Sequence, residues 1–176
     1  TTSFRFGGAW EPPLNDRRVR MALNYAIDIN ALRGSIFSKD AIPATQLVVP
    51  NIFGYNPDLK VWPFDPKKAR QLLDEARKDG VPVDKEITLV GRTGYFPGVE
   101  ELMEVVLTMY KAVGLNVKLK MVEYGVFLQH NNKPFPTYLY ILQKSHDNNK
   151  GDAWFTAFYQ YHCKGAQAVI CDKQVD

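Results

Sequence analysis

The sequence predicts an α/β fold in which a mixed sheet is covered by helices. Segments with the period of a helix alternate with segments that have the period of a strand along the 176 residues. Parallel strands need a crossover, usually a helix, to bring the chain back, so this alternation favours a parallel or mixed sheet over an all-α bundle or a β-sandwich. The length suits one core, because single domains commonly run to about 100 to 200 residues.

The first predicted element is a helix that begins near residue 16. Pro12 and Pro13 close an irregular start, and Asn15 or Asp16 can accept hydrogen bonds from the N–H groups of a first turn. Apolar residues then recur at the spacing of one helical face: Val19, Ala22, Leu23, Ala26 and Ile27. Residues 34–63 carry scattered Pro, Gly and Asn residues without a period, which predicts a long irregular connection.

A second helix is predicted from Asp65, which caps it, to a stop at Gly80. Pro66 occupies the first helical position, where a missing N–H is harmless. The apolar stripe comprises Ala69, Leu72, Leu73 and Ala76.

A strand follows at residues 87–90, which are rich in β-branched residues. A third helix carries an apolar face and ends at Gly114; the face comprises Val99, Leu102, Val106, Met109, Tyr110 and Val113. Residues 117–122 then alternate in polarity like a strand, and a short amphipathic turn is expected at Phe127 and Leu128.

The last predicted pair is a strand and a helix joined by a polar loop. Residues 138–142 form the strand, and residues 144–150 form the polar run after it. A helix from about Ala153 to Tyr161 is capped by Asp152.

Composition and charge exclude two classes of partner. No stretch approaches the roughly 20 apolar residues that span a bilayer. The net charge of +3 comes from 22 basic and 19 acidic residues scattered along the chain, so nucleic acid is not an expected partner.

The first nine residues contain neither an initiator Met nor a secretory signal, so the chain starts after processing or inside a longer protein.

Two segments carry a family resemblance. Residues 13–28, PLNDRRVRMALNYAID, and residues 64–76, FDPKKARQLLDEA, stand in the order and at about the distance of two recognisable signatures. They resemble the second lobe of the bacterial solute-binding proteins that serve peptide, nickel and related ABC importers. The end of the chain, with Gly151, Asp152, Cys163 and Cys171, resembles the dipeptide-binding members of that family.

The resemblance implies a fold and a set of partners. Residues 1–176 would form a single lobe of a bilobed periplasmic-binding-protein-like fold of type II, and the first lobe of the same protein would be missing from this chain. The partners would be a peptide or other small solute and an ABC permease in the inner membrane. The location would be periplasmic or extracytoplasmic, either free or lipid-anchored, and no cofactor is expected.

The two cysteines leave alternatives. Cys163 and Cys171 lie eight positions apart in a turn-rich segment, which suits a small disulfide loop in an oxidising compartment. The resemblance supports that pairing. The neighbouring His162 and Asp172 would make a zinc site with them, but the spacing is not that of a standard finger or ribbon, so a disulfide or two free thiols is favoured.

The resemblance also implies a ligand loop at residues 144–151. Peptide-binding members hold the ligand's ammonium with an Asp near an aromatic residue, because a desolvated ammonium needs a counter-charge. Counting back from Gly151 without gaps places Asn149 at the acidic position and His146 at the aromatic one, whereas a two-residue insertion places Asp147 there. Asn149 would favour a blocked peptide or another solute, and a plain helix-capping turn is the alternative.

Aromatic and basic residues add further candidates. Trp62 and Trp154 are expected in the core more often than on a ligand, and Trp154 is kept as a ligand candidate. Arg17, Arg18 and Arg20 open a helix whose dipole disfavours cations, so structural ion pairs are expected there.

The sequence therefore favours a binding module over an enzyme. No Gly-x-Ser-x-Gly, His-Glu-x-x-His or phosphate-binding loop is present, and no catalytic residue is proposed. The alternatives are a hydrolase, a metal-binding domain and a partner-docking domain.

Overall fold

The computed structural model describes residues 2–7, 11–146, 151–169 and 171. In chain order its elements are β1 (Thr2–Gly7), α1 (Arg17–Tyr25), α2 (Ile29–Leu32), α3 (Pro66–Lys78), β2 (Ile87–Arg92), α4 (Val99–Ala112), β3 (Val117–Val122), α5 (Tyr124–Asn131), β4 (Tyr140–Ser145) and α6 (Ala153–Gln160).

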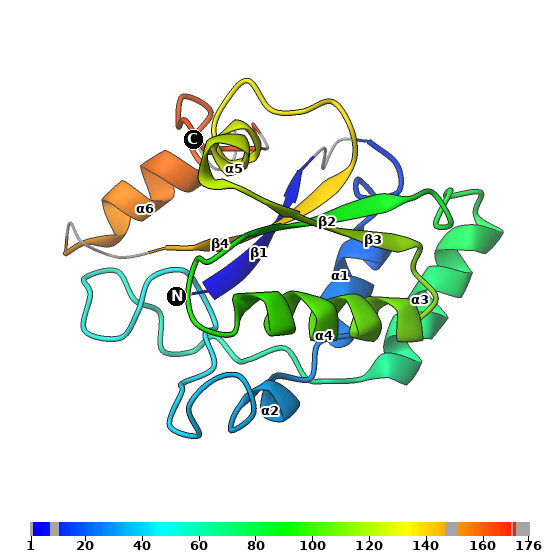
Figure 1. Cartoon of the computed structure of the whole chain (residues 1–176), viewed down its shortest axis with the longest axis horizontal. Coiled ribbons are helices and arrows are strands. Elements are labelled where there is room, and N and C mark those ends of the chain that lie inside the picture. The colour runs from blue at the N-terminus through cyan, green and yellow to red at the C-terminus, as the bar shows by residue number, and fades with distance from the viewer. Residues whose placement is uncertain (1, 8–10, 147–150, 170, 172–176) are drawn as a thin grey trace.

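The sheet is mixed, as the alternating pattern predicts. Its strand order is β1-β4-β2-β3, with β2, β3 and β4 parallel and β1 antiparallel to β4. The carboxyl ends of the three parallel strands therefore meet at one edge of the sheet, which lies on the left in Figure 1. The amino end of β1 reaches the same edge, because Thr2 pairs with Ser145.

Helices cover both faces of the sheet (Figure 1). The main core lies on the face covered by α1, α3 and α4, and it includes Leu23, Leu73, Leu89, Val106 and Ile141. A smaller cluster lies on the face covered by α5, and it comprises Val90, Val122, Phe127, Tyr140 and Leu142. The apolar stripes predicted for α1, α3 and α4 supply the larger core.

Four aspartates among the described residues cap helices: Asp28 caps the short helix α2 by accepting the N–H of Ala31 at 3.0 Å, and the other three are the caps that the sequence predicts. The side chains of Asp16, Asp65 and Asp152 accept backbone N–H groups from Arg18, Lys68 and Phe155 at 2.7, 2.8 and 3.1 Å. Caps of this kind typically stabilise a helix by about 0.5 to 2 kcal/mol, since they satisfy first-turn N–H groups that have no helical partner.

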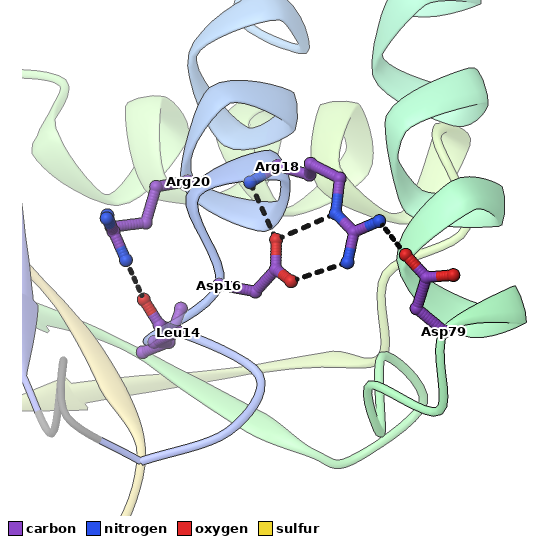
Figure 2. Close-up of polar contacts among 5 residues, drawn as sticks. All are labelled: Leu14, Asp16, Arg18, Arg20 and Asp79. Atoms are coloured by element: carbon purple, nitrogen blue, oxygen red, sulfur yellow. Dashed lines mark hydrogen bonds and ion pairs between the residues drawn. The ribbon is translucent and has the colours of Figure 1, made fainter.

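Arg18 ties α1 to the end of α3, as Figure 2 shows. Its guanidinium forms a fork with the two carboxylate oxygens of Asp16 at 2.8 and 3.1 Å and also pairs with Asp79, the C-cap of α3. The hydrogen bond from Arg18 holds the pKa of Asp16 below its usual range. Arg20 instead donates to the carbonyl of Leu14 at 2.8 Å, so the expected ion pair is not the contact made at this position.

Three sequence expectations differ from the structure. Residues 2–7, expected to be irregular, form β1, because their partner strand lies about 140 positions away along the chain and the short alternation of Phe4 and Phe6 with Arg5 signals it weakly. The turn expected at Phe127 is the eight-residue helix α5. The strand placed at 138–142 begins at Tyr140 and ends at Ser145, so Lys144 belongs to the sheet and not to the polar loop.

Candidate functional site

The carboxyl edge of the parallel strands is the candidate site. Open α/β sheets usually bind ligands at this edge, because loops from several strands converge there. The segments after β2, β3 and β4 here are residues 93–98, the start of α5 and residues 146–152.

His146, a predicted ligand residue, is buried against α6. Its Nε2 atom lies 2.8 Å from the hydroxyl of Thr156, and its Nδ1 atom lies 3.5 Å from the amide nitrogen of Gln160. These contacts fix the ring in the interface between β4 and α6. Asp147 and Asn149, the two alternatives for an ammonium partner, lie outside the described residues.

Trp154 lies at the surface. It is 69% exposed and stacks on Phe158 with ring centroids 5.3 Å apart, whereas Trp62 makes an edge contact with Tyr25 at 5.1 Å. Phe53, from the long connection, is 84% exposed, and its carbonyl accepts the N–H of Ala153 at 2.9 Å. Exposed aromatic rings from two distant segments therefore stand at the first turn of α6.

Arg92, at the end of β2, is a candidate site residue that the sequence alone did not indicate. Its guanidinium carbon lies 4.7 Å from the ring centre of Tyr95 and 4.4 Å from that of Tyr124. Its buried Nε atom makes no hydrogen bond to any described residue. The two rings hold a cation in a fixed place at the candidate edge. The sequence signal that could have indicated this residue is an Arg that ends an apolar strand just before a Gly-containing loop.

Lys144 is a second missed residue. Its side chain is 3% exposed, and its ammonium donates to the amide oxygens of Gln160 and Gln167 at 2.7 and 2.6 Å. Burial, and to a lesser degree the charge of Arg5, lowers the pKa of Lys144 to about 7. The amide of Gln160 also donates to the Gln167 oxygen at 2.7 Å, so a polar network surrounds the amine.

A cavity of about 1180 Å³ runs along β1 and reaches Lys144. Its walls are largely apolar, and they are formed by β1, the turn of α2, residues 41–50 and the end of α6. The ionisable side chains on the described walls include the cations Arg5, Arg33 and Lys144 and no Asp or Glu. Its volume is ample for a small organic ligand, since such pockets commonly measure about 300 to 1,000 Å³.

The cysteines form a disulfide between Cys163 and Cys171, with Cα atoms 4.6 Å apart. They are therefore not thiolate ligands in this structure, and the Nδ1 atom of the neighbouring His162 accepts the N–H of Lys164 at 3.0 Å. Within the described part of the chain, no three His, Cys, Asp or Glu residues come together in a group that would hold a metal ion. No helix among those same residues is long and apolar enough to cross a membrane.

A mixed sheet that brings aromatic rings and a cation together at one edge defines an α/β domain with a candidate ligand site at that edge. A family model described as bacterial extracellular solute-binding proteins, family 5 Middle, matches residues 1–165. The chain belongs to this family. Its members are binding proteins for transport and not enzymes, in agreement with the absence of catalytic motifs from the sequence.

Characterised relatives match parts of the chain. The dipeptide-binding protein of Escherichia coli (strain K12) is 32% identical over 118 residues, which are 66% of this chain and 22% of that protein. The glutathione-binding protein GsiB of the same strain is 48% identical over 66 residues, which are 38% of this chain and 13% of that protein. The matched segments thus span less than a quarter of either relative's length.

Solved structures share the fold over nearly the whole chain. OppA of Burkholderia pseudomallei matches 98% of this chain and 35% of its own, with a TM-score of 0.75 and 22% identity. The murein tripeptide-binding protein MppA, in its unliganded open form, matches 98% of this chain and 34% of its own, with a TM-score of 0.73 and 20% identity. These likenesses show that the mixed sheet and its helices have the architecture of part of an oligopeptide-binding protein.

Proposed function

We propose that residues 1–176 form the second lobe of a two-lobed solute-binding protein that captures a small solute and delivers it to an ABC permease in the inner membrane. The family match over residues 1–165 carries this proposal. The candidate edge supports it, because the rings of Tyr124 and Trp154 are exposed there and Arg92 stacks on Tyr124, where a second lobe would close on a solute.

The solute we propose is a peptide or a related small molecule. Relatives named for dipeptides and for glutathione support this class. The guanidinium of Arg92 would receive a main-chain carboxylate, since Arg pairs well with planar anions and this one lacks a partner at Nε among the described residues. Trp154 would contact an apolar part of the solute, and Asp147 or Asn149 stays the proposed partner of its amino end.

The family match indicates the compartment in which the protein works. The family is extracellular or periplasmic, and the disulfide between Cys163 and Cys171 suits such an oxidising compartment. We propose that the full-length protein works there next to the membrane, either free or held by a lipid anchor.

Lobe closure is the test of this proposal. Small-angle X-ray scattering would compare the full-length protein alone with the same protein in an equimolar mixture of di- and tripeptides. A smaller radius of gyration in the mixture is expected, since the two lobes close on the solute. An unchanged radius together with no detectable peptide binding in calorimetry would contradict peptide capture.

A further inference from the structure

At a pH below its pKa of about 7, Lys144 is a buried cation held by neutral groups. Its ammonium, which has three donors, donates to two amide oxygens among the described residues. The amides are themselves fixed, because Gln160 donates to Gln167 and the Nε2 of Gln167 lies 3.3 Å from the side-chain oxygen of Asn132. The network holds the amine in place without cancelling its charge.

The described elements around Lys144 carry cations. Side chains two positions apart on a strand share a face, and Val90 and Leu142 are register partners in the smaller cluster. Arg92 and Lys144 each lie two positions further along, and Arg5 pairs with Leu142, so the three cations share one sheet face.

The helices that cover this face contain no acidic residue that would balance the positive charge. The four strands and the helices α5 and α6 contain no Asp or Glu, and the acids nearest to the two helices in sequence are their N-caps, Glu123 and Asp152. The carboxylate of Asp152 already accepts the N–H of Phe155. An anionic group that enters this layer would therefore meet a positive potential.

The cavity along β1 gives such a group access. Its walls include Ser3, Arg5, Lys144, Gln160 and Tyr161, so β1, β4 and the end of α6 enclose the space beside the amine. The guanidinium of Arg5 is held there by the backbone carbonyls of Asn131 and Gln167, each at 3.0 Å, and not by an acid among the described residues. Arg5 therefore adds charge to the niche; its Nη atoms are engaged by backbone carbonyls, and its buried Nε atom makes no hydrogen bond to a described residue.

We propose that Lys144 binds a second anionic group of the solute, the side-chain carboxylate of an acidic peptide, in the cavity bounded by β1, β4 and α6. This inference rests on the proposed function and narrows its solute class. Arg92, at the edge of the sheet, would then bind the main-chain carboxylate, and Lys144, inside the cavity, would bind the side-chain carboxylate. A buried cation that has no acid partner among the described residues gains more from an incoming carboxylate than an exposed one does, since water screens it less.

Two dipeptides that differ in one charge test this inference. Calorimetry on the full-length protein at about pH 6, where an amine with a pKa of about 7 is largely protonated, would compare Ala-Glu with Ala-Gln, which have the same shape and the same termini. Wild type is expected to bind Ala-Glu about tenfold more tightly, and Lys144→Met is expected to bind both equally. The matched control is Lys120→Met, an exposed lysine on the same sheet face, which should keep the preference.

A second variant covers the case in which Lys144→Met does not fold. Gln167→Glu puts a carboxylate where the amide oxygen lies 2.6 Å from the amine, so the chain supplies the anion itself. This variant should unfold at the same or a higher temperature than wild type and lose the preference for Ala-Glu. A merely structural Lys144 would instead leave the preference intact in both variants.

The outcomes separate the two proposals. If wild type binds Ala-Glu and Ala-Gln equally, or either variant keeps the preference, the role of Lys144 is wrong and peptide capture stands. If wild type binds neither dipeptide and does not close in the peptide mixture, peptide capture fails and the inference fails with it.

Discussion

The backbone carbonyl of Phe53 accepts the N–H of Ala153 at 2.9 Å. This bond fastens the middle of the long connection to the first turn of α6, next to the candidate edge. Gly54 follows Phe53 with a φ of +90°, and a Cβ atom at this position would lie 2.5 Å from the Cβ of Ala153. Two segments that lie about 100 positions apart in the sequence are thus joined where no larger side chain fits.

Gly54→Ala should therefore destabilise the protein more than the same change at Gly80. Gly80 has a φ of +80° and nothing within 4 Å of its added Cβ, so it shares the backbone penalty and lacks the clash. We expect Gly54→Ala to cost about 1 to 3 kcal/mol more in the free energy of unfolding. Urea unfolding of both variants measures the difference, and equal losses would show that the close approach of Gly54 to Ala153 costs nothing.

Asp16→Ala should lower stability by about 1 to 2 kcal/mol, because it removes both the cap of α1 and the fork with Arg18. Asp16→Asn keeps an oxygen for the cap and should lose less. The folded pKa of Asp16 lies below the unfolded value of 3.8, so its contribution is fully present above that value and is lost as the pH falls through the folded pKa. Unfolding curves of wild type and Asp16→Asn at neutral pH and below pH 3.8 test this, and parallel pH profiles would contradict it.

The helices show how much the sequence reveals. The stripes of α1, α3 and α4 and the caps Asp16, Asp65 and Asp152 are local patterns of three or four positions, and each appears in the structure. β1 could not be recognised in this way, since its hydrogen bonds depend on β4 at the other end of the chain. The parallel order of β2, β3 and β4 follows only in outline from the alternation of elements.

The site was harder to predict than the fold. His146 and Trp154 were named in advance, and the structure places the first inside the β4 and α6 interface and the second at the surface. Arg92 and Lys144 were missed, because their significance depends on which side chains surround them. Nothing in the sequence alone shows that two glutamines bracket Lys144 or that two tyrosines bracket Arg92.

Lys144 should make the stability of the protein rise with pH between about 7 and 10.5. Its folded pKa of about 7 lies below the ordinary value of 10.5, so between these values the unfolded chain binds more protons than the folded one. Stability should therefore rise with pH from about 7 upward, by up to about 1.4 kcal/mol per pH unit. The low pKa of Lys144 comes from its burial and from the charge of Arg5, and the amine is held by hydrogen bonds to Gln160 and Gln167.

Lys144→Met should remove that slope. Denaturant unfolding at pH 7, 8 and 9 would compare the variant with wild type, and Lys120→Met serves again as the exposed control. A wild-type slope no steeper than that of Lys144→Met would show that the amine is protonated throughout this range.

Arg92→Met should weaken the binding of a peptide with a free carboxyl end. Loss of charge-assisted hydrogen bonds of about 1.5 to 3 kcal/mol corresponds to roughly 10- to 100-fold in affinity. The same variant should bind the C-terminal amide of that peptide about as well as wild type does. Arg17→Met, which removes an exposed arginine from α1, is the control, and an equal loss for both peptides would contradict the assigned role.

The isolated chain should fold yet bind solute weakly. Its main core of buried residues from α1, α3, α4 and the sheet is continuous, which supports independent folding. The proposed cleft, however, needs contacts from a second lobe, so calorimetry on residues 1–176 should show affinity at least about tenfold below that of the full-length protein. Micromolar binding by the isolated chain would contradict the two-lobed arrangement.

The most direct test of solute capture is a mass-spectrometric inventory of the small molecules released when the full-length protein, purified from its native compartment, is denatured. The proposed function predicts an intact peptide or peptide-like solute at close to one molecule per protein, with acidic side chains over-represented if Lys144 acts as inferred. A protein that releases no such solute and that cleaves added peptides would contradict it.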